Sequence, residues 1–187
     1  LHGQRRAQRT TPSFEKSRIL PAGPADETPA DDGPSLPSSF TVNDILEISP
    51  QAPTLNMEPD GLGIVGQPVN FWVDASTHQM SGTLLNRPVQ VEFIPVGVRW
   101  DFGDGTTWET ESLGGSWAEL GLPELSDTAT SHRYQEKATV TVTASVSYSA
   151  TVHIAGRSIP VQGTVTAATA ALTFELFVQS TVLVPNP

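Results

Sequence analysis

The side chains of this sequence that could perform chemistry include two closely spaced aspartates, Asp101 and Asp104, followed by Glu109. Carboxylates gathered in one loop are ligands that calcium prefers, so a calcium site is one hypothesis. The spacing differs from that of an EF-hand loop, in which acidic or amide side chains alternate ahead of a glycine and a distant glutamate. We favour the alternative in which the two aspartates accept backbone hydrogen bonds within a turn, and we expect no cofactor.

The signatures of hydrolytic enzymes are missing from the sequence. It contains no Cys, no G-x-S-x-G segment and no H-E-x-x-H segment, which are the patterns that supply a nucleophile or a metal-activated water. No pair of acids lies in a context typical of glycosidase carboxylates. The histidines are His2, His78, His132 and His153. We predict no enzymatic activity, and a Ser/His/Asp site assembled by folding is the alternative.

Three tryptophans are candidates for a binding surface: Trp72, Trp108 and Trp117. Trp72 alternates with Phe71 and Val73, so we expect its side chain to point away from the core. An exposed Trp can stack on a sugar ring or anchor a protein interface. In the alternative interpretation, residues 108–120 fold back and bury Trp108 and Trp117 in a small second core.

Charge is distributed unevenly along the chain. The 187 residues include 10 basic and 20 acidic residues, a net charge of −10. Residues 1–18 hold five of the basic residues and one acid, Glu15, and no Lys or Arg occurs between Arg18 and Arg87. The acidic excess argues against nucleic acid as a partner, since a phosphate backbone needs a basic surface. No apolar run approaches the ~18 residues of a membrane-spanning helix.

The first 37 residues have the composition of a tail. Within residues 21–37 there are five prolines and four acids, Asp26, Glu27, Asp31 and Asp32. Such a composition buries too little apolar surface to offset the entropy of ordering. We interpret residues 1–37 as a basic arm followed by an acidic linker, in which the four acids are solvated. The arm is either an ordinary disordered tail or a segment that becomes ordered on a partner.

From residue 61 onward, apolar and polar residues alternate with a period of two. In residues 138–151 every even position is apolar or aromatic and every odd position is Ser or Thr. This pattern predicts a strand with one buried and one solvated face. Similar alternation predicts strands at 69–75, 89–93, 98–102 and 172–178. Strands separated by Gly, Pro and Asn turns predict an antiparallel β-sandwich over residues 61–184.

Residues 38–60 are transitional between the tail and these strands. Asn43 or Asp44 could cap a single helical turn, or the segment could form a short edge strand. Pro50, Pro53 and Pro59 exclude a longer element. We expect this segment to cover one edge of the sheet.

Two further local signals lie later in the chain. Residues 155–158 predict a turn, after which Val161 and Val165 begin a return strand. Residues 116–120 predict one helical turn, with Ser116 as its cap and Glu119 at the capping-box position.

The most specific pattern in the chain has three parts. Residues 100–105 read WDFGDG, residues 132–134 read HRY, and residues 140–143 read VTVT. In this order they resemble the PKD domain, an immunoglobulin-like β-sandwich, and residues 66–71 resemble the first core strand of that family. The resemblance covers residues 61–152. The motif residues are Trp100, Asp101, Phe102, Gly103, Asp104, Gly105, His132 and Tyr134.

This motif has a physical interpretation as a folding element. Trp100 and Phe102 share one strand face, so both are expected in the core. Gly103 and Gly105 can adopt the positive φ angles that a tight reversal needs. The resemblance implies that the His and the Tyr of the H-x-Y pattern pack or hydrogen-bond near the turn.

The chain departs from the family pattern in three places. Residues 135–138 read QEKA where the family has a glycine before its last motif strand. Residues 108–130 form a longer insertion, and residues 152–184 add a hairpin and a further strand. With these additions the chain is similar to surface proteins of actinobacteria that contain a single PKD domain.

The resemblance implies a non-enzymatic module that is extracellular or at the cell surface. Our first hypothesis is a structural subunit of a surface assembly, such as a pilus, coat or stalk. It would contact copies of itself or other subunits through residues 1–37 and its strand edges. The alternatives are an adhesion or carbohydrate-binding module that uses the exposed tryptophans, and an accessory domain of a larger secreted hydrolase.

Overall fold

The computed structural model describes residues 35–180. The chain divides into two units, residues 1–36 and residues 37–187, and every strand described belongs to the second unit. The predicted basic arm and the acidic cluster of Asp26, Glu27, Asp31 and Asp32 lie outside the described residues.

The described residues form two β-sheets and one short 3-10 helix, which confirms the all-β prediction. The elements are β1 (Phe40–Thr41), η1 (Val42–Ile45), β2 (Thr54–Glu58), β3 (Leu62–Ile64), β4 (Pro68–Asp74), β5 (His78–Leu84), β6 (Arg87–Asp101), β7 (Thr107–Thr110), β8 (His132–Arg133), β9 (Thr139–Ile154), β10 (Arg157–Gln162), β11 (Val165–Ala168) and β12 (Leu172–Phe177). No helix in this part of the chain has the length and apolar character to cross a membrane.

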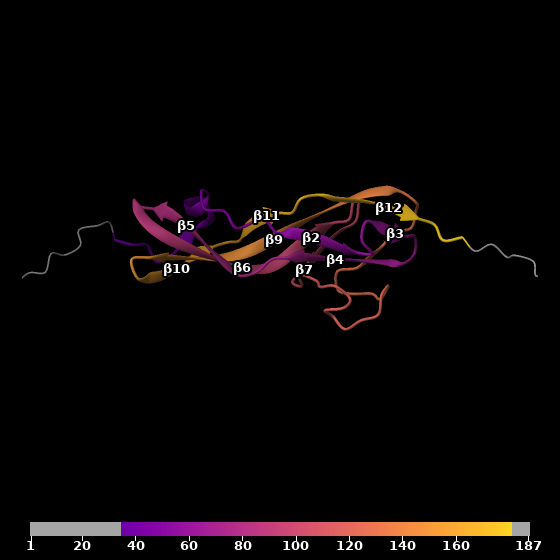
Figure 1. The fold of residues 1–187 in the computed structure, drawn as a ribbon. Coiled ribbons are helices and arrows are strands. Elements are labelled where there is room, and N and C mark those ends of the chain that lie inside the picture. The colour runs from indigo at the N-terminus through magenta and orange to yellow at the C-terminus, as the bar shows by residue number, and fades with distance from the viewer. Residues whose placement is uncertain (1–34, 181–187) are drawn as a thin grey trace, which may run out of the picture. The chain divides into compact units, whose positions relative to one another are not determined.

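The larger sheet is built around β9, which is 16 residues long. One edge of β9 pairs with β6 over eleven residue pairs, and the two strands run side by side in Figure 1. The other edge pairs in succession with β12, β11 and β10. Beyond β6 lie β5 and β7, and the outer strands β1 and β3 pair with β10 and β12. Strand β9 therefore pairs directly with β6, β10, β11 and β12, and each outer strand pairs with one of these four.

Alternation along β9 confirms the period-two prediction, because its even residues from Val140 to Ile154 are all buried. Strand β6 keeps its apolar side chains on the same face only by means of a bulge. Pro95 pairs with Tyr148 and Gly97 pairs with Ser147, so Val96 is the extra residue. The bulge moves the buried parity from odd positions, such as Phe93, to even ones, such as Trp100.

The smaller sheet, of order β2-β4-β8, packs over one half of the larger one. Phe71 of β4 lies 5.7 Å from Phe102 and 6.1 Å from Phe174 between ring centroids. All three rings are buried. This aromatic contact joins the two sheets through a shared core, the arrangement of a β-sandwich.

The other half of the larger sheet is covered by residues 40–48, which we call the strap. Its strand β1 pairs in parallel with β10, and Phe40, Ile45 and Ile48 are buried. Ile48 lies directly on Gly82 of β5, where a Cβ atom would come within 2.3 Å of the Ile48 side chain. The strap thus covers the edge of β10, as expected for the 38–60 segment.

Several predictions for residues 38–60 need correction. The cap of η1 is Thr41, and Asp44 instead accepts hydrogen bonds from the Thr41 backbone N–H and hydroxyl. The segment also contributes β2 between Pro53 and Pro59, with Leu55 and Met57 buried against the core. Five residues between two prolines are too few for the alternation to stand out in sequence.

Three other expectations differ from the structure. The sheet is not purely antiparallel, because β1–β10 and β12–β3 are parallel pairs. The return strand begins at Arg157, directly after a two-residue turn at Ala155 and Gly156, and β11 is separate from it. Val178 lies beyond the end of β12 and is 62% exposed.

We predict that Ile48→Ala lowers the free energy of unfolding by about 2–4 kcal/mol, because it leaves a cavity above β5. The neighbouring Leu46 is 66% exposed, whereas Ile48 is 5% exposed, so Leu46→Ala is a matched control expected to change stability by less than about 0.5 kcal/mol. Urea unfolding measures both variants. If Ile48→Ala were as stable as Leu46→Ala, packing of Ile48 on β5 would not stabilise the sheet.

Candidate functional site

The WDFGDG segment spans the last two residues of β6 and the tight turn that follows. Gly103 and Gly105 have φ angles of 76° and 90°, as predicted. A Cβ on Gly103 would also lie 2.3 Å from the Thr141 carbonyl oxygen, so no larger residue fits there. Asp101 accepts a hydrogen bond from the Gly103 N–H at 3.0 Å, and Asp104 accepts one from the Thr106 N–H at 2.9 Å. The two aspartates therefore stabilise the turn as expected.

His132 and Tyr134 contact this turn and hold it in place. The His132 ring stacks on Phe102 at 4.3 Å, and its Nε2 lies 2.7 Å from Asp104 Oδ2. The Tyr134 hydroxyl donates to the Phe102 carbonyl at 2.9 Å. Burial, with the charges of Asp104 and Asp101, raises the pKa of Tyr134 far above its ordinary value, so the hydroxyl keeps its proton.

The remaining catalytic and metal candidates do not gather into one site. Glu109 forms an ion pair with Arg99 at 2.9 Å on the neighbouring strand. Among residues 35–180, no three His, Asp or Glu side chains lie where they could hold a metal ion. His78 accepts the Gln51 N–H, and His153 contacts Ser158. The three histidines of the described residues therefore have separate hydrogen-bond partners and do not form a common site.

We predict that Asp104→Ala lowers the free energy of unfolding at pH 7 by about 1.5–3 kcal/mol, the usual contribution of hydrogen bonds to a charged group. Burial raises the pKa of Asp104, but the hydrogen bonds from His132 and Thr106 outweigh burial and hold the pKa below 3.8. A lowered carboxyl pKa gives stability that is present above pH 3.8 and is lost as the pH falls through the folded-state value.

Urea unfolding at pH 7 and at pH 3 tests this expectation. The difference between the wild type and Asp104→Ala should shrink at the lower pH. Glu136→Ala, which removes an exposed carboxylate outside the turn, is the control and should stay within about 0.5 kcal/mol of wild type. An Asp104→Ala variant as stable as the wild type at pH 7 would contradict the interpretation of the motif as a folding element.

The insertion between β7 and β8 lies along β4, on the edge opposite β2 (the salmon loop of Figure 1). The Val73 N–H donates to the Leu113 carbonyl at 2.9 Å, and the Thr130 hydroxyl donates to the Phe71 carbonyl. Gly114, at φ 78°, approaches so closely that a Cβ there would lie 2.8 Å from the Trp72 Cβ. The insertion is therefore held tightly against the strand.

A buried side chain fixes the insertion from beneath. Asn70 is fully buried, donates to the Gly115 carbonyl at 2.8 Å and accepts from the Thr128 hydroxyl at 2.7 Å. Glu58 accepts the Trp117 N–H at 2.8 Å. The Ser116 and Glu119 capping box forms as predicted, within a single turn that does not extend into a helix.

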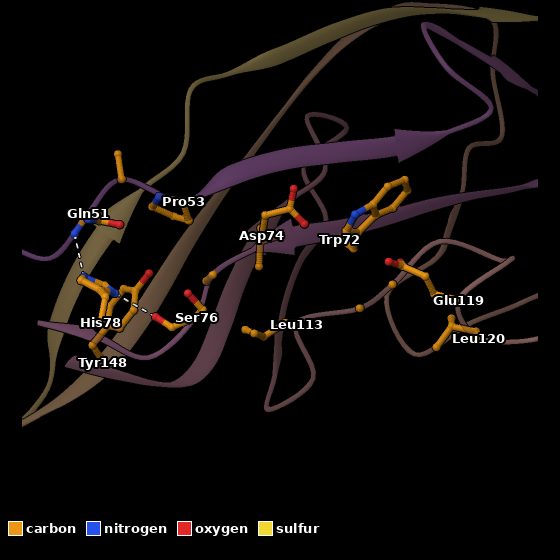
Figure 2. Close-up of a pocket in the computed structure, with 15 residues that line it drawn as sticks. Gln51, Pro53, Trp72, Asp74, Ser76, His78, Leu113, Glu119, Leu120 and Tyr148 are labelled. Carbon is orange, nitrogen blue, oxygen red and sulfur yellow. Dashed lines mark hydrogen bonds between the residues drawn. The ribbon is translucent and has the colours of Figure 1, made fainter. Parts of the chain in front are cut away.

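The outer side of β4 and the insertion enclose an open groove of about 570 Å³. We call it the Trp72 groove, and its lining includes Gln51, Pro53, Trp72, Asp74, Ser76, His78, Leu113, Glu119, Leu120 and Tyr148. Figure 2 shows the half-buried Trp72 indole with Asp74 toward one side and Glu119 toward the other. The groove contains no Lys or Arg among its lining residues.

The groove is acidic and partly apolar. Asp74 Oδ2 accepts from the Asn56 amide at 3.0 Å, and Glu119 Oε2 accepts from Ser116 at 2.9 Å. The hydrogen bonds from Ser116 lower the pKa of Glu119, so it stays ionised near neutral pH. Neither carboxylate forms an ion pair with a described residue. An aromatic face between two carboxylates can recognise a cation or a polar ring.

The three tryptophans that were predicted to form a binding surface do not lie on one surface of the fold. Trp72 faces outward as expected, and Trp108 is 48% exposed at the edge strand β7. Trp117 is only 4% exposed, and its indole N–H donates to the Ser126 carbonyl, so the expectation that it lies on a binding surface is wrong. The insertion needed its own small core, and Trp117 fills it, whereas Trp108 stays outside.

Sequence reasoning missed Asp74 and Glu119 as partners of Trp72. Asp74 could have been found, because it shares the outward parity of Trp72 on one strand. Glu119 lies 47 residues from Trp72 in the sequence, and no local pattern connects the two. Comparison with protein-family models and with curated proteins found no match for the chain.

We predict that Asn70→Ala lowers the free energy of unfolding by about 2–3 kcal/mol, because it leaves a buried carbonyl and a hydroxyl without their partner. Amide exchange at Val73 and Trp117, whose N–H groups donate to Leu113 and Glu58, should accelerate as the insertion loosens. Asn56→Ala, which removes a more exposed amide of the adjacent strand, is expected to cost less than about 1 kcal/mol. Similar effects of the two variants would contradict this role of Asn70.

Proposed function

We propose that this chain is an extracellular, non-enzymatic PKD-type module that acts as a structural subunit of a cell-surface assembly. Support for the PKD type comes from the motif. The turn of residues 101–105 is closed by His132 and Tyr134, which contact the side chain of Asp104 and the carbonyl of Phe102. Two sheets share the core around it, as the immunoglobulin-like family would require.

The observation that carries the proposal is the Trp72 groove. It combines a half-buried indole, two carboxylates without a described cationic partner, and the exposed Leu120. Aromatic anchors in concave, partly apolar surroundings are typical of sites that bind proteins. We therefore assign the groove to contact with another protein subunit.

Other surfaces of the molecule also suit an assembly. Strands β5 and β7 pair only with β6, so each has an outer edge without a strand partner in the described part of the chain. Ile94 and Val96 lie between them on β6 and are 41% and 43% exposed. Strand β9, paired along both edges, supplies a rigid frame that can transmit force between contacts.

Glycan binding is a second candidate, and it is favoured by one observation. The Trp72 indole lies beside the amide of Asn56 and the carboxylate of Asp74, which pair on the same outer face of β2 and β4. A ring face next to polar side chains can stack on a sugar and hydrogen-bond its hydroxyls. This candidate uses the same groove with a different ligand.

Size-exclusion chromatography with light scattering on the full chain tests the assembly. We expect a mass that rises with concentration above the 19.9 kDa of one chain. A mass that stays at one chain would contradict an assembly of copies. If, in addition, a glycan array gave binding that Trp72→Leu abolishes, the second candidate would replace the first.

A further inference from the structure

We propose that the Trp72 groove binds the basic segment, residues 1–18, of a second copy of this chain. An arginine of that segment would stack on the Trp72 indole and pair with Asp74 and Glu119. This inference rests on the proposed function, because contact between copies is what the assembly requires. It adds the identity of the two surfaces that meet.

The groove offers the chemistry that a guanidinium group needs. Each carboxylate uses one oxygen for a structural hydrogen bond, Asp74 Oδ2 with Asn56 and Glu119 Oε2 with Ser116. The other oxygens, Asp74 Oδ1 and Glu119 Oε1, accept no hydrogen bond from a described residue. A planar guanidinium can stack on an indole and bond carboxylates in the same pose.

The other titratable groups of the groove are His78 and Tyr148. Burial raises the pKa of Tyr148, and neither group supplies the missing cation. The Nδ1 of His78 lies 2.8 Å from the Ser76 carbonyl, and its Nε2 accepts the Gln51 N–H, as the dashed lines of Figure 2 show. A ring held in this way is a neutral donor and acceptor. The negative charge of the groove is therefore not balanced from within its lining.

The basic residues of the chain lie almost wholly at one end. Residues 1–18 carry Arg5, Arg6, Arg9, Lys16 and Arg18 against a single acid. In the described part of the chain, Arg99 pairs with Glu109 and Arg133 pairs with Asp127. The basic segment is thus the strongest charge complement to the groove that this protein contains.

Apolar contacts match as well. Leu113 and Leu120 line the groove beside Trp72, and Leu120 is 46% exposed. They can receive the aliphatic stems of Arg side chains, which commonly pack on apolar surface while the charged end binds elsewhere. The segment also contains Phe14, an aromatic side chain that could add to this contact.

Titration of a synthetic peptide, residues 1–18, into the full chain tests the inference. The receptor is the full chain with Arg5→Gln, Arg6→Gln, Arg9→Gln, Lys16→Gln and Arg18→Gln, so that its own segment does not compete. Calorimetry gives the affinity, and NMR follows the four indole N–H signals. Trp100 and Trp117 donate internally to Thr110 and Ser126, so their signals are references.

We expect the Trp72 indole signal to move and that of the exposed Trp108 to stay. Asp74→Asn with Glu119→Gln in the receptor should weaken binding about tenfold, since the arginine would lose both of its charged partners. The matched control, Asp60→Asn with Glu136→Gln, makes the same charge change outside the groove and should leave the affinity within about twofold. Trp72→Leu should weaken binding by a factor similar to that of Asp74→Asn with Glu119→Gln, which we call the groove pair.

Three results would overturn the inference, and the first two leave the proposed function open to its own test. Equal weakening by the groove pair and the control pair would show a non-specific charge effect. A native chain whose mass rises with concentration, unchanged by Asp74→Asn with Glu119→Gln, would place the contact between copies elsewhere. A single-chain mass at all concentrations, with peptide binding retained, would show that the segment occupies its own groove and that copies do not assemble.

Discussion

The structure depends on the pairing of β9 along both of its edges. Because every second residue of this strand is buried, it presents one continuous apolar face over its whole length. Strand β6 follows that face, and the bulge at Val96 keeps its own apolar residues in step. On the other edge, β12, β11 and β10 succeed one another. The smaller sheet covers one half of this apolar face, and the strap covers the other half. The core is therefore completed by a sheet on one side and by a short segment of chain on the other.

Strand β4 connects this core with the candidate site. Its inward residues Phe71 and Val73 belong to the shared core, while Asn70, Trp72 and Asp74 face outward. Burial of Asn70 beneath the insertion positions the loop that carries Glu119. A change in the core or in the insertion would therefore move the groove.

Charge separation gives the site its character. The groove gathers carboxylates and no Lys or Arg, while half of the basic residues of the chain lie within residues 1–18. Complementary charge mainly sets the partner and the rate of encounter, and the apolar contacts of Trp72 and Leu120 would supply the desolvated area on which affinity depends. Such a contact would weaken with salt, as expected for partly exposed charges.

The sequence alone determined the strands with long alternation, the buried Trp100 and Phe102, and the geometry of the WDFGDG turn. These features depend on local periodicity and on backbone angles that glycine permits, so neighbouring residues suffice to predict them. Tertiary structure decided the rest. It placed β2 in the core, buried Trp117 and left Trp108 exposed, and joined Trp72 to Asp74 and Glu119 across 47 residues. These outcomes depend on which surfaces meet when the insertion packs on β4, and that packing involves residues far apart in the chain.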